Sequence, residues 1–368
     1  MRVAFYAPLK PPDHPVPSGD RRIARLFLDG LRLAGHQPFV ASRLRSYDGE
    51  GDPERQQRLA AIGRRSAERL LRRWRARPVE APQLWLTYHL YYKAPDWLGP
   101  IVTRALGIPY VIAEASFAPK RAGGPWAIGH RAVAAALGQA DAVLGLNPAD
   151  RDGVLPLLAD AGRWVALPPF LDAGFYAARP EARSGPPRLI AVAMMREGDK
   201  LGSYRLLGAA LEKLLYLSWT LDVIGDGPAR PEVEAALEPL GSRIRYLGAL
   251  DDTAVAAALA AADLFVWPAI NEAFGMALLE AQASGLPVVA GISGGVAGVV
   301  ADSATGLLVP PGDGDGFAQA VRRLILEPGT RRAMGAAARE KVCREHDLPQ
   351  ATARLAAVIE RLGRKRAA

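Results

Sequence analysis

Two glutamates, Glu272 and Glu280, lie on either side of a Phe-Gly turn in the segment PAINEAFGMALLEAQASG. An ionised carboxylate accepts hydrogen bonds from paired hydroxyl groups. If the whole segment were helical, the eight-residue step between them would separate the carboxylates by about 12 Å, roughly the scale of a sugar and a ribose flanking a diphosphate. We therefore expect Glu272 to orient a sugar and Glu280 to orient a ribose.

The turn between the glutamates offers a complementary site for an anion. If residues 274–284 form a helix, the free amides of Phe274, Gly275 and Met276 point out of its first turn, where the helix dipole favours negative charge. The segment therefore predicts that a diphosphate binds between two groups that bear hydroxyls.

The elements that must position these residues follow the pattern of an α/β protein. Short apolar runs alternate with longer amphipathic stretches, as in repeated βα units with a parallel sheet. In the first half we expect strands at Val3–Ala7, Pro38–Ala41, Leu84–Tyr88, Pro109–Ala113, Ala142–Leu146 and Trp164–Leu167. In the second half we expect them at Leu189–Ala193, Leu221–Ile224, Ile244–Leu247, Leu264–Trp267, Pro287–Ala290 and Leu307–Val309. Ligands of such sheets bind beyond the carboxyl ends of the strands, where Glu272 falls.

The length of 368 residues exceeds the usual size of one hydrophobic core and predicts two Rossmann-like domains. We place the first at residues 1–170 and the second at 188–345. The stretch 171–187 is rich in Pro, Gly and Ala and is expected to connect them. Residues 346–368 should form a C-terminal helix that could return to the first domain.

Further motifs in the second half strengthen the diphosphate hypothesis and name a family. VIGDGPAR (223–230), IRYLG (244–248) and ISGGVAGVVADSATGLLVPPGD (292–313) accompany the paired glutamates. Together they resemble the Glu-x7-Glu region of glycosyltransferase family 4. The resemblance implies the GT-B architecture, two Rossmann-like domains facing across a cleft. It also implies retaining transfer of a sugar from a nucleotide-sugar donor to an acceptor hydroxyl, in polysaccharide or glycolipid assembly.

The same resemblance assigns roles to single residues. An Arg and a Lys that bind the donor diphosphate follow the first strand of the second domain in this family, and AMMREGDKLGSY offers Arg196 and Lys200 there. With Glu272 they form the expected catalytic set, because fixed positive charge stabilises the departing diphosphate. The remaining donor-binding candidates are Gly19, Gly225, Asn271, Phe274, Gly275, Met276 and Glu280.

The first domain resembles the acceptor-binding half of the family, with PSGDRRIARLFLDGLRLAGHQPFV at 17–40 as its first loop and helix. Gly19 would then approach the donor from across the cleft. Many members carry a histidine after the fourth strand, a place taken here by Glu114. His89, which follows the third strand, is a second candidate on the acceptor side.

Composition narrows the partners and the compartment. The net charge of +8 and the pI near 9.7 suit an anionic partner without choosing one. One cysteine, Cys343, excludes an intrachain disulfide and fits a reducing compartment. We expect a cytoplasmic protein without metal or other cofactor that binds no nucleic acid, and whose acceptor is a saccharide or a lipid-linked saccharide.

The stretch Arg55–Arg77 suggests a place at the inner face of a membrane. Leu59, Ile62, Leu70 and Trp74 fall on roughly one helical stripe among arginines, so the helix could lie on anionic lipid. The alternative is that the stripe packs on its own domain.

Other functions remain open from the sequence. GISGG places Ser293 in a G-x-S-x-G pattern after a strand, as in a serine hydrolase, with His346 and Asp302 as partners. We interpret this serine instead as part of a glycine turn, and Asp313-Gly314-Asp315 as a helix cap rather than a metal-binding DxD. An epimerase or phosphorylase of the same architecture, or a basic nucleic-acid-binding protein, are the remaining alternatives.

Overall fold

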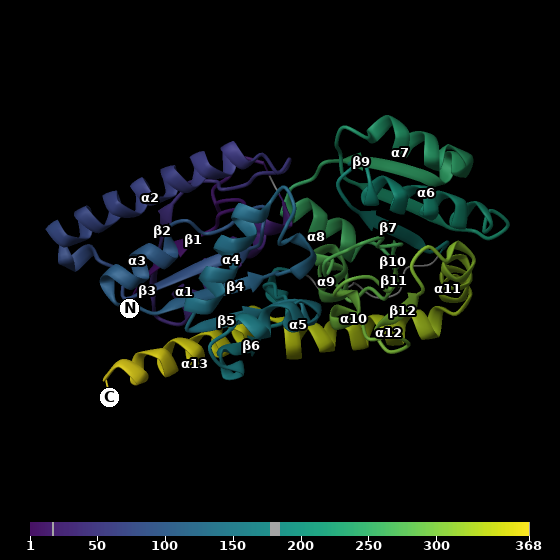
Figure 1. The fold of residues 1–368 in the computed structure, drawn as a ribbon. Helices are drawn as coiled ribbons and strands as arrows, with labels where there is room; N and C mark the ends of the chain where they lie inside the picture. Colours follow the sequence, from purple (N-terminus) through teal and green to yellow (C-terminus); the bar gives the residue numbers. More distant parts are fainter. Residues whose placement is uncertain (17, 177–184, 368) are drawn as a thin grey trace. The chain divides into compact units, whose positions relative to one another are not determined.

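The computed structural model describes residues 1–16, 18–176 and 185–367. They form two compact units: unit 1 comprises Met1–Pro168 together with Leu348–Ala368, and unit 2 comprises Pro169–Asp347. Each unit has a six-stranded sheet whose strands all pair in parallel, with helices between them. The expected α/β class with two Rossmann-like domains is therefore confirmed (Figure 1).

Unit 1 has the strand order β2-β1-β3-β4-β5-β6. Its strands are β1 (Arg2–Tyr6), β2 (Gln37–Ser42), β3 (Leu84–Leu90), β4 (Tyr110–Ala115), β5 (Ala142–Gly145) and β6 (Trp164–Ala166). Its helices are α1 (Gly19–Leu33), α2 (Pro53–Ala76), α3 (Gly99–Leu106), α4 (Ala127–Gln139), α5 (Arg151–Val154) and α13 (Leu348–Ala367). This order reverses beside β1, so ligands are expected at the carboxyl ends of β1 and β3.

Unit 2 has the order β12-β11-β10-β7-β8-β9, which reverses between β7 and β10. Its strands are β7 (Arg188–Val192), β8 (Thr220–Ile224), β9 (Ile244–Gly248), β10 (Leu264–Trp267), β11 (Val288–Gly291) and β12 (Gly306–Val309). Its helices are α6 (Asp199–Glu212), α7 (Arg230–Leu237), α8 (Asp252–Ala260), α9 (Met276–Ala283), α10 (Val296–Val299), α11 (Gly314–Leu326) and α12 (Pro328–Lys341). The strands in both units end within one or two residues of the predicted positions.

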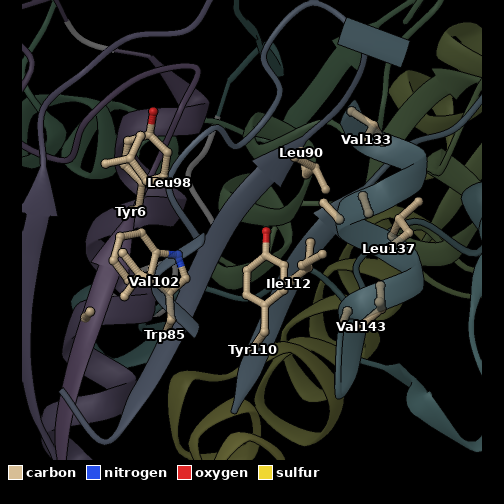
Figure 2. Packing of buried hydrophobic residues seen from close by; sticks show 14 of the residues in the cluster. Tyr6, Trp85, Leu90, Leu98, Val102, Tyr110, Ile112, Val133, Leu137 and Val143 are labelled. Atoms are coloured by element: carbon tan, nitrogen blue, oxygen red, sulfur yellow. The ribbon is translucent and has the colours of Figure 1, made fainter. Parts of the chain in front are cut away.

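One face of the unit 1 sheet is covered by an aromatic and aliphatic core (Figure 2). Trp85 on β3 is fully buried, and its ring centroid lies 6.1 Å from that of Tyr6 on β1. Tyr110 and Ile112 on β4 point to the same face, because alternate residues of a strand share a side. Burial of these large rings fixes the strands whose carboxyl ends carry the polar loops.

The junction between the units differs from the predicted linker. The amide of Leu171 donates to the carbonyl of His346 at 3.0 Å, and that of Ala173 donates to the Asp347 carboxylate at 2.9 Å. Residues 169–176 therefore pack into unit 2, whereas residues 177–184 of the stretch 171–187 lie outside the described residues.

The C-terminal helix α13 packs against α1 of unit 1. Gly30 of α1 lies at this contact, where an added Cβ would come within 3.3 Å of the Thr352 hydroxyl oxygen. The chain thus re-enters unit 1 at Leu348, after a short π-helical segment at Val342–His346.

Candidate functional site

The loops that follow β7 and β10 carry the predicted donor residues. These two strands are hydrogen-bonded neighbours and parallel, so both loops leave the same edge of the unit 2 sheet. Arg196 and Lys200 follow β7, and Glu272 follows β10. The sheet order reverses here, which is where open α/β sheets bind ligands.

The structure brings Lys200 and Glu272 together. The Lys200 ammonium forms an ion pair with the Glu272 carboxylate. It lies 5.4 Å from the ring centroid of Trp267, whose indole N–H donates to the same carboxylate oxygen at 3.4 Å. The side chains of Lys200 and Glu272 are only 27% and 18% exposed, so the pair is held in a partly dry environment. A fixed cation therefore stands beside a fixed carboxylate.

Ser293 holds the loop that carries Glu272. Its hydroxyl accepts a hydrogen bond from the amide of Glu272 at 2.7 Å and donates one to the carbonyl of Ala269 at 2.5 Å. Gly294 has φ of +50°, and a Cβ there would lie 2.1 Å from the Glu272 carbonyl oxygen. The Ser-Gly pair is therefore a brace for Glu272, a role that the interpretation as a glycine turn did not foresee.

The serine-hydrolase alternative has no support from these contacts. A nucleophilic serine needs a histidine within hydrogen-bond reach. The ring nitrogens of His346 instead contact the Pro169 carbonyl at 2.8 Å and the Lys341 ammonium at 2.9 Å. Both ring nitrogens are thus in contact with groups other than Ser293.

Helix α9 begins later than predicted. Its first residue is Met276 rather than Phe274, because Gly275 takes φ of +69° and serves as the N-cap. The amide of Leu278 already bonds to the Gly275 carbonyl. The helix start has no capping side chain, so the amides that can face an anion are those at its first positions, Met276 and Ala277. Glu272 precedes the helix, so the 12 Å estimate for an all-helical segment does not apply.

Glu280 lies inside α9 and is only 6% exposed. Arg196, in contrast, is exposed, and the described residues include no ion pair for it. Asn271 donates from its side-chain amide to the Asp199 carboxylate at 2.8 Å, which links the loop after β10 to the start of α6. Gly225 has φ of +141°, and a Cβ there would lie 1.9 Å from the Ala193 carbonyl oxygen, so glycine is needed for packing between the loops after β7 and β8.

A second polar cluster lies at the carboxyl edge of the unit 1 sheet. His89 Nδ1 lies 2.8 Å from the Asp20 carboxylate and 3.9 Å from that of Glu114. His89 lies on β3, which ends two residues later than predicted, Glu114 lies on β4, and Asp20 lies in the first turn of α1. The sequence analysis named His89 and Glu114 but missed Asp20. Its position next to Gly19, at the start of a predicted helix, could have identified it. Gly19 is exposed, and a Cβ on it would meet nothing within 4 Å.

The charges of this cluster are strongly coupled. Burial lowers the pKa of His89, but the Glu114 and Asp20 carboxylates outweigh burial and raise that pKa from 6.5 to about 9. Burial raises the pKa of Glu114 despite the nearby imidazolium. It also raises the pKa of Asp150. His89 is therefore a cation at neutral pH.

Backbone strain coincides with both polar clusters. In the described chain, five residues other than glycine have positive φ. Four of them lie at these two sites: His89 and Glu114 near the ends of β3 and β4, and Ala269 and Asn271 in the loop after β10. Such conformations cost on the order of 1–3 kcal/mol each and concentrate at functional sites. The fold therefore maintains unfavourable backbone geometry at the two sheet edges where ligands are expected.

The DGD sequence has a structural role. Asp313 caps α11 by accepting from the amide of Gly316 at 2.8 Å, and Asp315 pairs with Lys213. The expected cap is thus confirmed for Asp313.

The predicted apolar stripe of α2 is correct only in part, and it packs on its own domain. Trp74 is buried and Leu70 packs against the core, but the contacts of α2 with α3 and α4 bury a different set of residues. Gln56, Ala60, Gly63, Ala67, Leu71 and Trp74 are the buried residues. Ile62 is 38% exposed, and Leu59 and Leu70 are only partly buried. No helix in the described part of the chain is long and apolar enough to cross a membrane.

The sequence comparisons with known proteins match mainly unit 2. Residues 186–327 match the family model described as "Glycosyl transferases group 1". This match lies within unit 2 and covers less than half of the chain. Sulfoquinovosyl transferase SQD2 of Arabidopsis thaliana is 33% identical over 42% of this chain and 30% of its own length. A D-inositol 3-phosphate glycosyltransferase of Kribbella flavida is 41% identical over 32% of this chain and 28% of its own length. The matches thus span about a third of these relatives.

Solved structures match both units together. A sucrose-phosphate synthase from Thermosynechococcus elongatus has a TM-score of 0.77 at 19% identity, covering 99% of this chain and 100% of that one. HepE of Anabaena, solved with UDP and glucose, has a TM-score of 0.68 at 16% identity over 98% and 99% of the two chains. The fold is therefore that of the two-domain GT-B proteins, and the sequence matches support the glycosyltransferase superfamily.

Proposed function

We propose that this protein is a retaining glycosyltransferase of family 4. It moves a sugar from a nucleotide-sugar donor to an acceptor hydroxyl in polysaccharide or glycolipid assembly. The observation that carries the proposal is the Lys200–Glu272 ion pair at the point where the unit 2 sheet reverses its order, inside the matched residues 186–327. A relative from Corynebacterium glutamicum, 36% identical over 33% of this chain, is named as a GDP-mannose-dependent mannosyltransferase.

The role of Lys200 follows from charge. Cleavage of the anomeric bond leaves negative charge on the nucleotide diphosphate, and a preorganised cation stabilises it. When donor binds, the ammonium exchanges the Glu272 carboxylate for the diphosphate oxygens, and Glu272 is released to accept hydrogen bonds from the sugar. Arg196, which is exposed beside the same loop, adds a second cation.

The helix start and Glu280 complete the donor site. The free amides at Met276 and Ala277 face the diphosphate, where the dipole of α9 adds to the positive field. Glu280 accepts hydrogen bonds from the ribose hydroxyls.

Retention at the anomeric carbon requires no enzyme nucleophile, because the departing phosphate takes the proton of the incoming hydroxyl. No metal is required either, so activity should survive EDTA; loss of activity that manganese restores would contradict this.

The test of donor binding uses a thermal-shift screen of nucleotides and sugar nucleotides with the full chain. A ligand that binds only the folded state at a hundred times its Kd adds about 2.7 kcal/mol of stability. Lys200→Ala should remove most of that shift. The matched control is Lys213→Ala, because Lys213 caps the other end of α6, about 20 Å away, and pairs with Asp315.

Product analysis separates the proposal from its nearest alternatives. A transferase joins the sugar to the acceptor and releases the nucleotide diphosphate. An epimerase returns an isomeric sugar nucleotide, and a phosphorylase forms a sugar phosphate. Inertness towards every sugar nucleotide would overturn the proposal.

We also propose that α2 meets an anionic membrane surface at the inner face, which suits a lipid-linked acceptor. The outward face of α2 carries Arg58, Arg65, Arg69 and Arg72, all exposed, with Ile62 among them. Arg58 pairs with Glu54 at 3.3 Å, whereas no ion pair of the other three occurs among the described residues. Each arginine near an anionic bilayer contributes about 1 kcal/mol.

A further inference from the structure

A group of aromatic and cationic side chains lies beside the His89 cluster in unit 1. The rings of His89 and Tyr91 are 5.0 Å apart, those of Tyr91 and Tyr92 are 5.6 Å apart, and those of Tyr92 and Trp126 are 5.5 Å apart. The four rings therefore form an unbroken series that starts at His89. We call Tyr92, Lys93, Arg121 and Trp126 the aromatic–cation platform.

The platform lies where a ligand of unit 1 is expected. Tyr92 and Lys93 follow β3, whereas Arg121 and Trp126 lie between β4 and α4. These strands are adjacent and parallel, so both loops leave the carboxyl edge of the sheet. All four side chains are half-buried, which keeps them in place while leaving them accessible.

Two cations share the same pair of rings. Lys93 Nζ lies 6.0 Å from the centroid of Tyr92 and 4.8 Å from that of Trp126. Arg121 Cζ lies 5.4 Å and 5.8 Å from the same two centroids. Attraction to ring faces at an exposed site contributes only about 0.5–1 kcal/mol, and it leaves the N–H groups of both cations available.

No carboxylate neutralises either cation within the part of the chain that the structure describes. The nearest acidic residue in the contacts of Trp126 is Asp48, whose backbone carbonyl accepts from the indole at 2.9 Å. The Asp48 carboxylate already accepts from Gln56 and from the amides of Glu50 and Gly51. Because both cations lie over the same two rings, an anion bound beside those rings is attracted by both charges.

We propose that Lys93 and Arg121 bind an anionic group, a carboxylate or a phosphate, carried by the saccharide acceptor. This inference rests on the proposed function and names the class of acceptor. The acceptor hydroxyl lies towards His89, and the charged group lies further along the aromatic series. The half-buried ring of Tyr91 between them offers a negative face to the C–H groups of a sugar.

The test is a set of ligand-observed NMR titrations of the full chain, with the donor site saturated by the nucleoside diphosphate that gives the largest thermal shift in the screen above. The probes are glucuronic acid, glucose 6-phosphate and glucose. We expect both anionic probes to bind at least tenfold more tightly than glucose, and the stronger of the two identifies carboxylate or phosphate as the preferred group. Lys93→Gln and Arg121→Gln should each weaken the anionic probes about tenfold and leave glucose unchanged.

Arg354→Gln is the matched control. Arg354 is an exposed arginine of unit 1 on α13, which packs on the end of α1 away from the loops after β3 and β4. The Arg354→Gln variant should bind the anionic probes like the wild type. Arg121→Lys should recover part of the affinity that Arg121→Gln loses. Glucose binding as tight as that of the anionic probes, no binding of either anion, or equal weakening by Arg354→Gln would each overturn the proposal.

A separate measurement distinguishes this failure from failure of the proposed function. Donor binding and sugar transfer are followed with the same variants. If transfer occurs and neutral and charged acceptors react equally, only the acceptor class is wrong. If no sugar nucleotide binds while the anionic probes still depend on Lys93 and Arg121, the platform stands and the proposed function fails.

Discussion

The charge state of His89 gives the sharpest physical prediction for unit 1. The pKa of His89 rises from 6.5 to about 9 on folding, through the Glu114 and Asp20 carboxylates and against the effect of burial. A shift of this size corresponds to up to about 3 kcal/mol in favour of the folded state. Because the folded-state pKa is the higher one, the stabilisation is complete below pH 6.5 and is lost as the pH rises through about 9.

The assay is the titration of histidine ring protons by NMR, in which a chain with five histidines gives a readable spectrum. His89→Gln identifies the resonance. Asp20→Asn removes the carboxylate that lies 2.8 Å from His89 Nδ1. The pKa of His89 should then fall, because only Glu114 remains close by to offset the effect of burial on the imidazolium. Urea unfolding of the wild type should lose more stability between pH 6.5 and 9 than that of His89→Gln. A His89 ring that titrates near 6.5 in the wild type would refute the reasoning.

Three further outcomes are expected. Lys200→Ala should lower kcat with the cognate donor about a hundredfold while the chain stays folded by circular dichroism, and near-normal turnover would exclude this lysine from the mechanism. Ser293→Ala should lower the unfolding temperature of unit 2 and reduce kcat, because the Glu272 amide loses its acceptor at a cost of about 1–3 kcal/mol; an unchanged Tm and kcat would show that the brace is dispensable. Arg65→Glu combined with Arg69→Glu should abolish cosedimentation with phosphatidylglycerol vesicles and leave turnover of a water-soluble acceptor unchanged, whereas undiminished sedimentation would refute membrane contact through α2.

The spacing of apolar residues in the sequence determined where the strands and helices of this protein form. Buried parallel strands require continuous apolar runs, and such runs are legible without knowledge of partners. Strand β10 was therefore predicted at its observed bounds, Leu264–Trp267. The rule that ligands bind at the carboxyl ends of strands pointed to Glu272, and the family resemblance pointed to Lys200. The structure places both residues in loops that leave the same edge of the unit 2 sheet.

Tertiary contacts decided which residues share a site. Asp20 and His89 are 69 positions apart, and Glu272 and Ser293 are 21 apart, so no local pattern pairs them. The same holds for the face of α2, where the sheet and its neighbouring helices bury Trp74 and leave Ile62 outside. The start of α9 depended on the positive φ of Gly275, and the spacing of apolar residues does not predict such a backbone conformation.

The sequence alone thus determined the layers of the fold and the edge at which each functional loop lies, because those follow from the local alternation of apolar residues. Only the tertiary structure decided that Ser293 braces Glu272 and that Lys93 and Arg121 lie over the same two rings. The physical reason is that hydrogen bonds and cation–ring contacts act over a few ångströms. Which groups come that close is fixed by how the helices and loops pack on the sheet.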